Sequence, residues 1–191
     1  MIENKLFPSD LPYGYFKLPR RRQITRPEWP QDLLDFFSMH EGLGFALQNG
    51  PLVQVAKVDE VFKVGWVDLK LSPDPPHAGW DNFTGFALGG SDYGDRIVYV
   101  VTAPGIPTGS ILALGVGAMS GPAGDDKDGP VGALVLSDSL KNWIARMERL
   151  GPMAHGIYLD PDLPDWVSES IESEIVRLNP FSKWANTSEE E

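Results

Sequence analysis

Apolar positions recur along this chain with two different periods, and each period predicts a kind of secondary structure. A period of three to four residues marks three segments as amphipathic helices: residues 29–42, 137–151 and 165–178. In the second segment Ser137 or Asp138 is expected to cap the start of the helix. In the third segment Asp165 is the expected cap, and the apolar side lies opposite serines and glutamates. Each apolar side has to be buried, so we expect the helices to cover a sheet.

Valine-rich runs with partial alternation predict about six strands. They are residues 52–58, 61–67, 83–88, 96–102, 110–116 and 131–136. Gly42 is expected to end the first helix. One helix, several strands and then two helices is an order typical of the α+β class. The predicted fold is therefore a mixed, mostly antiparallel sheet of about six strands with helices packed on one side.

Residues 97–124 contain no charged side chain, which raises the question of a membrane span. Pro104, Pro107 and Pro122 would break a helix there, so two strands joined by a turn are expected instead. The first residues lack the basic and apolar pattern of a signal peptide. The chain has no cysteine, which excludes disulfides and thiolate chemistry and fits a reducing compartment. We expect a cytoplasmic protein that does not enter a membrane.

The formal net charge of −11 is unevenly distributed. Residues 1–30 hold six basic and three acidic side chains, whereas residues 31–191 hold ten basic and 24 acidic ones. Such a body repels nucleic acid and anionic membranes and attracts a basic protein. The run Arg20–Arg22 is interpreted as a solvated charge cluster. We expect an extended arm (1–28), one α+β domain (29–152) and an acidic helical extension packed on it (153–191), while the oligomeric state stays open.

The glycine-rich stretch GFALGGSDYGDRIVYVV, residues 85–101, is the first candidate for a catalytic or phosphate-binding motif. A nucleophile elbow requires Gly-x-Ser-x-Gly, but the glycine after Ser91 comes one place late, at Gly94. A phosphate loop requires a lysine, and none lies between Lys70 and Lys127. A dinucleotide-binding turn requires a helix after the glycines, where a strand is expected. The stretch is therefore predicted to be a hairpin turn.

The sequence contains none of the metal-binding motifs considered. His40, His77 and His155 lie far apart and show no spacing typical of metal ligands. The acidic loop at residues 124–129 lacks the carboxylates that an EF-hand needs at its first and twelfth positions. We expect neither a metal ion nor another cofactor.

Three segments together resemble the SUKH superfamily, which includes bacterial immunity proteins and a fungal cell-wall-synthesis regulator. The segments are FTGFALGGSDYGDRIVYVV, PGIPTGSILALG and VGALVLSDSLKNWIARME. The positions that carry the resemblance are Phe86-Ala87, Gly94, Ile97, Ser139-Leu140 and Trp143-Ile144. It covers about residues 27–150, including the proline-preceded first helix. The resemblance implies a mixed-sheet α+β fold, no catalytic centre, and the binding and neutralisation of a partner toxin, often a nuclease.

The first functional hypothesis is therefore a non-enzymatic, immunity-type protein that binds a basic toxin. Its expected contact residues lie in two acidic loops, with Tyr93 as the aromatic anchor: Asp92, Tyr93, Asp95, Asp125, Asp126 and Asp128. The alternative interpretation of these loops is ordinary solvated turns. Two further hypotheses stay open. One is an enzyme acting on a polar substrate through carboxylates, with candidate residues His77, Trp80 and Asp81; the other is a regulatory scaffold protein.

Overall fold

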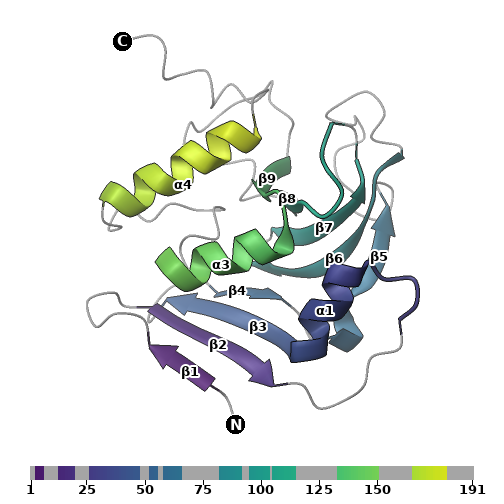
Figure 1. Cartoon of the computed structure of the whole chain (residues 1–191), viewed down its shortest axis with the longest axis horizontal. Helices are drawn as coiled ribbons and strands as arrows, with labels where there is room; N and C mark the ends of the chain where they lie inside the picture. Colours follow the sequence, from purple (N-terminus) through teal and green to yellow (C-terminus); the bar gives the residue numbers. More distant parts are fainter. Residues whose placement is uncertain are drawn as a thin grey trace.

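Nine described strands pair into one sheet at the centre of the protein (Figure 1). The computed structural model describes residues 3–6, 13–19, 26–47, 52–55, 58–65, 82–91, 95–103, 105–114, 133–150 and 165–179. The strands are β1 (Glu3–Leu6), β2 (Tyr13–Pro19), β3 (His40–Leu47), β4 (Leu52–Val55), β5 (Phe62–Gly65), β6 (Thr84–Ser91), β7 (Arg96–Thr102), β8 (Ile111–Leu114) and β9 (Ala133–Ser137). Their order is β1-β2-β3-β4-β6-β7-β8-β9. Strand β5 pairs with residues 84–87 of β6, while β4 pairs with residues 89–91 of the same strand.

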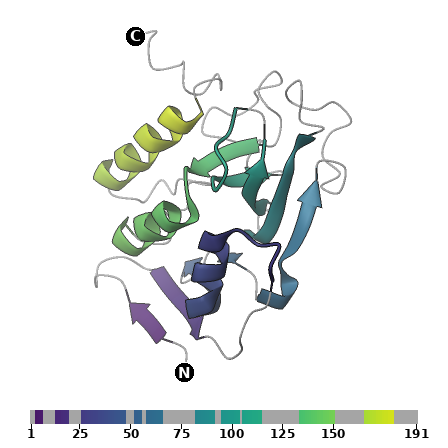
Figure 2. The same cartoon turned by 45° about the vertical axis from the view of Figure 1, so that its right-hand side comes forward.

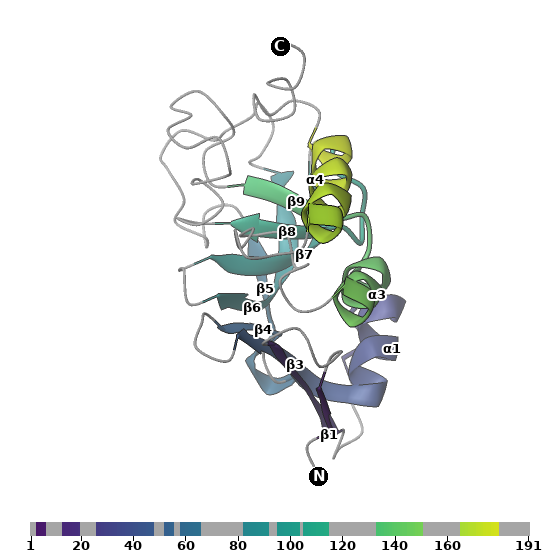
Figure 3. The ribbon, with the colours of Figure 1, turned by 90° about the vertical axis from the view of Figure 1, so that its left-hand side faces the viewer.

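The three described α-helices lie on one face of this sheet (Figure 3). They are α1 (Gln31–Met39), α3 (Leu140–Leu150) and α4 (Asp165–Leu178), and the short 3-10 helix η1 (Val58–Glu60) precedes β5. Helix α3 lies between α1 and α4 in this layer (Figures 2 and 3). The predicted α+β class, with helices packed on one side of a sheet, is confirmed.

Alternate residues of β7 contribute to two apolar clusters, one on each face of the sheet. Ile97 and Tyr99 belong to the cluster that the helices cover, whereas Val98 and Val100 belong to the second cluster. Successive side chains of a strand point to opposite faces, so a strand that is buried on both faces must be apolar throughout. This explains why RIVYVVT reads as an almost unbroken apolar run.

The helix-side core forms around aromatic rings. Trp29, just before α1, packs against Phe37 at 5.3 Å and against Phe86 of β6 at 5.9 Å between ring centroids. Trp143 of α3 is fully buried in the same cluster. Burial of such a side chain contributes about 2–3 kcal/mol of stability. The apolar sides of the helices are therefore held against the sheet.

Strands β6 and β7 form the antiparallel pair that the glycine-rich stretch predicts. A Cβ atom on Gly85 would lie 2.6 Å from the carbonyl oxygen of Tyr99, and one on Gly90 would lie 2.7 Å from that of Asp95. Both distances are too short for any side chain, so these glycines allow β7 to approach β6 closely. Here the glycines serve packing between strands.

The sheet is larger than expected because three strands come from the first 47 residues. Strands β1 and β2 lie in the segment expected as an extended arm, and β2 pairs antiparallel with β3. Every pairing among the described strands is antiparallel, so the part of the sheet that the structure describes is not mixed.

Two expected helix ends differ in detail. Helix α1 ends at Met39, and the backbone of His40 is already extended, so Gly42 lies within β3 instead of ending the helix. The cap of α3 is Ser139, whose hydroxyl oxygen accepts a hydrogen bond from the backbone N–H of Asn142 at 3.2 Å. Asp138 is one residue too early for this role and instead accepts a bond from the Asn142 side chain at 2.8 Å.

Candidate partner-binding surface

Helix α4 docks on the protein through one side only. Ile171 and Ile175 lie four residues apart on that side and are buried in the helix-side core. Residues four apart on a helix share a face, so this pair fixes which side of α4 points inward. The opposite side is consequently turned outward.

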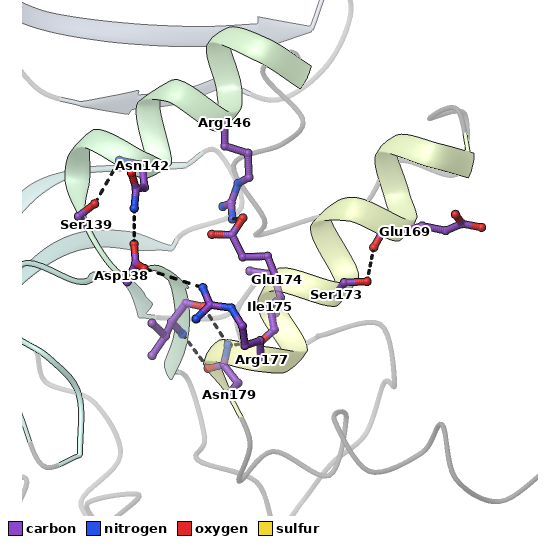
Figure 4. Close-up of polar contacts among 11 residues, drawn as sticks. Asp138, Ser139, Asn142, Arg146, Glu169, Ser173, Glu174, Ile175, Arg177 and Asn179 are labelled. Carbon is purple, nitrogen blue, oxygen red and sulfur yellow. Dashed lines mark hydrogen bonds and ion pairs between the residues drawn. The ribbon is translucent and has the colours of Figure 1, made fainter.

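Asn179, the residue after α4, attaches the end of the helix to the edge strand β9 (Figure 4). Its side-chain carbonyl accepts a hydrogen bond from the backbone N–H of Val135 at 2.9 Å. Its amide group donates to the carbonyl oxygens of Val135 and Ile175, both at 2.8 Å. The side chain thus hydrogen-bonds to both the backbone N–H and the carbonyl of Val135, as a further strand would. This protects the edge of β9 from pairing with other chains.

An ion pair joins α4 to α3 halfway along the helix (Figure 4). Nη1 of Arg146 lies 2.9 Å from Oε2 of Glu174, and the exposed fractions of the two side chains are 3% and 27%. Burial lowers the pKa of Arg146, an effect that the charges of Glu174 and Asp138 partly offset. The guanidinium therefore depends on its carboxylate neighbours to remain in the interior.

A second ion pair between α4 and the segment before α3 lies at the surface. Arg177 of α4 approaches Asp138 at 3.9 Å, and both side chains are exposed. Exposed pairs at this distance contribute at most about 1 kcal/mol. The position of α4 is thus set by its buried isoleucines, by Asn179 and by the Arg146–Glu174 pair.

The outward side of α4 carries an aromatic side chain, a carboxylate and two hydroxyl groups. Trp166 is 60% exposed in the first turn. Glu169, Ser170 and Ser173 follow at three, four and seven residues, which places all four side chains on the side opposite the buried isoleucines. We name Trp166, Glu169, Ser170 and Ser173 the α4 outer stripe. In Figure 4 the side chain of Glu169 points away from α3.

The exposed charges of α4 are mostly negative. The exposed acidic residues are Asp165, Glu169 and Glu172, and the exposed basic residue is Arg177. Among the described residues, Glu169 and Glu172 form no ion pair, whereas Arg177 lies near Asp138. Asp165 lies in the first helical turn, where the helix dipole favours a carboxylate. The surface of α4 therefore suits a cationic partner.

A different polar cluster joins α1 to β7. The hydroxyl of Tyr99 donates to Oδ1 of Asp32 at 2.7 Å, and the backbone N–H of Leu33 donates to the same oxygen at 3.0 Å. Burial, followed by the hydrogen bond to Asp32, raises the pKa of Tyr99. Gly109, at φ +92°, lies next to this pair: a Cβ atom on it would be 3.5 Å from the Tyr99 hydroxyl. The hydroxyl and the carboxylate are partners within the fold, so the cluster serves to dock α1.

The expected contact residue that the structure describes, Asp95, does not lie on the surface. Only 3% of it is exposed, directly before β7. The carboxylate of Asp95 is thus buried in the described structure, and its role as a partner contact stays a prediction. The other expected contact residues lie outside the described residues: Asp92, Tyr93, Asp125, Asp126 and Asp128.

The residues of the enzymatic alternative also lie outside the described part of the chain: His77, Trp80 and Asp81. His40 begins β3, with its ring 5.4 Å from that of Phe36. Within the described ranges, no three His, Asp or Glu side chains come together as metal ligands would. Of the described helices, none is long and apolar enough to cross a membrane.

Comparison with protein-family models, curated proteins and solved structures finds no match to this chain. The resemblance to the SUKH superfamily stays a prediction that depends on the residues quoted for it.

The α4 outer stripe was not among the expected contact residues, although the sequence contains a signal for it. The apolar positions of this helix are 167, 171, 175 and 178, and Trp166 stands one residue before the first of them. It therefore does not belong to the apolar side. A helical projection places it on the side of Glu169 and Ser173. An aromatic residue on the polar side of an amphipathic helix is the pattern that identifies this surface.

Proposed function

We propose that this protein is a non-enzymatic binding domain that neutralises a basic partner protein, in the manner of toxin-immunity proteins. The observation that carries the proposal is the outward side of α4, where an exposed indole lies beside Glu169, a carboxylate that no described cation neutralises. A basic partner would gain both association rate and selectivity from such a surface.

The charge of the whole chain supports the same partner class. Residues 31–191 hold 24 acidic and ten basic side chains. Toxins that act on nucleic acid present basic surfaces to their substrate, so an acidic protein that covers such a surface competes with the substrate. The resemblance to the SUKH superfamily implies the same activity.

The experiment is co-expression. A tagged form of this protein is used at low salt to capture its partner, and the captured protein is then expressed alone in a bacterial host. We expect the partner to be basic, to stop growth when expressed alone, and to be harmless when this protein is present. If the captured partner is acidic, or if growth stops whether or not this protein is present, the proposal is wrong.

A further inference from the structure

Trp166 is the exposed tryptophan of the described part of the chain. Trp29 and Trp143 are both buried in the helix-side core, whereas 60% of Trp166 is exposed. The docking of α4 leaves this side chain outside, because Trp166 lies opposite the buried Ile171 and Ile175. Tryptophan is enriched among the residues that dominate binding energy at protein interfaces. An indole left outside on a docked helix therefore points to contact with another molecule.

Another exposed ring, that of Phe62 on β5, is already covered by a cation. The guanidinium carbon of Arg96 lies 5.9 Å from its centroid, and Arg26 makes a similar contact with Trp29 at 5.8 Å. Among the described residues no cation lies over Trp166. Because 60% of Trp166 is exposed and no described cation lies over it, its indole can accept a cation from outside, which is the kind of group that aromatic rings attract.

The two residues that follow Trp166 by one helical turn are Glu169 and Ser170. Residues three and four apart on a helix have Cβ atoms about 5–6 Å apart, and their side chains lean toward the start of the helix. This spacing allows the carboxylate of Glu169 and the indole to contact one and the same partner group. Ser170 is too short to cover the ring, so the indole and the carboxylate are both open to one partner group.

Glu169 determines which partner suits this ring. An apolar partner would cover the carboxylate without neutralising it, which is unfavourable. Phosphate groups of a nucleic acid or a membrane would be repelled. The cation of α4 on the same side of the helix, Arg177, lies eleven residues beyond Trp166, about 16 Å along the helix axis, and close to Asp138. The group that satisfies both the ring and the carboxylate is a cation brought by the partner.

Arginine fits this arrangement better than lysine. Its planar guanidinium stacks on an aromatic face while its N–H groups bind a carboxylate in pairs. The ammonium group of lysine is a compact, strongly hydrated charge that makes neither the stack nor the paired bonds. A surface with an indole one helical turn from a carboxylate therefore distinguishes the two basic side chains.

We propose that the α4 outer stripe binds an arginine-bearing segment of the partner, with Trp166 stacked on a guanidinium that hydrogen-bonds to Glu169. This inference rests on the proposed function and names the surface and the partner chemistry that serve it. Arginine, and not basic charge in general, is the recognised group.

The test uses the full chain and two synthetic peptides of equal length and charge, octa-arginine and octa-lysine, in calorimetric titrations at about 50 mM salt, where exposed charges are weakly screened. We expect octa-arginine to bind the wild type about three- to tenfold more tightly than octa-lysine, the range of one cation–π contact. Trp166→Ala is expected to reduce the preference to the share that comes from the paired bonds to Glu169, and Trp166→Phe to retain more of it. Glu169→Gln is expected to weaken octa-arginine more than octa-lysine, because it removes the acceptor of the paired bonds.

Glu172→Gln is the matched control, because it removes the same charge from an exposed position of the same helix. Glu172 lies six residues beyond Trp166 and about 120° around the helix from it, so it does not face the indole. This variant is expected to weaken both peptides equally and to preserve the arginine preference. All substituted side chains are exposed, so the thermal transition of each variant should match that of the wild type.

Equal binding of the two peptides to the wild type overturns the inference, and so does a preference that Trp166→Ala leaves unchanged. The same holds if Glu169→Gln and Glu172→Gln change the preference alike, since the effect would then be one of overall charge.

The co-expression experiment separates this inference from the proposed function. If wild type and Trp166→Ala protect the host equally, neutralisation holds and the α4 outer stripe is not its surface. If the wild type gives no protection, the proposed function fails, while the peptide titrations still decide whether the stripe recognises arginine.

Discussion

Removing Glu174 should destabilise the protein far more than removing its partner Arg146. The two side chains form an ion pair at 2.9 Å, but Arg146 is 3% exposed and Glu174 is 27% exposed. Glu174→Ala leaves a buried guanidinium whose pKa burial has already lowered, and it removes the larger of the two carboxylate effects, from Glu174 and Asp138, that offset this burial. Breaking a buried pair in this way costs about 3–5 kcal/mol, and we expect about 3 because water reaches Glu174.

Arg146→Met replaces the buried cation by an apolar side chain of similar length. Glu174 then keeps partial contact with water, so we expect a loss of only about 1 kcal/mol. The double variant Arg146→Met with Glu174→Ala should lose little more than Arg146→Met alone. The two single losses should therefore together exceed the double loss by almost 3 kcal/mol (about 3 plus about 1, less slightly more than 1), which measures the coupling between the residues.

The assay is urea denaturation followed by circular dichroism. Free energies of unfolding are compared between variants whose dependence on urea concentration has the same slope. Arg177→Met is the control, because its side chain is exposed and lies 3.9 Å from Asp138, and we expect a change below about 0.5 kcal/mol. Equal losses for Glu174→Ala and Arg146→Met, or a double variant whose loss equals their sum, would refute the proposed role of burial.

Three further variants test other contacts of the fold. Asn179→Asp retains the acceptor for the Val135 N–H but turns a carboxylate toward two carbonyl oxygens. Asn179→Ala should lower the free energy of unfolding by about 2–3 kcal/mol, and Asn179→Asp by at least as much. A wild-type midpoint in urea denaturation would contradict this. Gly85→Ala places a Cβ atom 2.6 Å from the Tyr99 carbonyl and should cost about 3 kcal/mol; an unchanged melting temperature would show that β6 and β7 separate freely. Because the pKa of Tyr99 is raised in the folded state, its contribution to stability is complete below the unfolded pKa near 10 and is lost as pH rises further. Tyr99→Phe should therefore lessen the decrease in the free energy of unfolding between about pH 9 and pH 11. An identical decrease in both proteins would exclude this tyrosine as its source.

Elements with strong local patterns were predicted nearly to the residue. Helix α4 and strand β7 have the bounds that their apolar periods indicate, residues 165–178 and 96–102. Strands β8 and β9 lie within about two residues of their predicted bounds. In these segments the local preference and the tertiary environment agree, because each side that needs burial finds a partner in the fold.

Strand β3 was not predicted, because its sequence favours no strand by itself. Two of its eight residues are glycines, Gly42 and Gly44, which are uncommon in strands, and it follows α1 without an intervening turn. It forms because β2 and β4 pair on its two edges. Backbone pairing with neighbouring strands leaves no periodic signal in one sequence, which is why the sheet has more strands than the pattern indicates.

The acidic character of the candidate surface followed from the sequence, but its location did not. Counts of charge favoured the glycine-rich and acidic loops, and the structure instead buries Asp95. A carboxylate beside a strand is placed inside or outside by the packing of its neighbours, which a charge count does not include. The rotation of α4 about its axis, by contrast, can be inferred from its apolar residues, and this rotation decides where Trp166 points.

The contacts that hold α4 also orient its outer stripe. Ile171 and Ile175 set the inward side, the Arg146–Glu174 pair prevents rotation at mid-helix, and Asn179 fixes the end against β9. A helix held at separate points along one side presents the opposite side without further ordering, so little conformational entropy is lost when a partner binds. The buried polar contacts of α4 thus have a consequence beyond stability: they hold the backbone that carries Trp166 and Glu169 in one orientation, so that only these two side chains need to be ordered when a guanidinium binds.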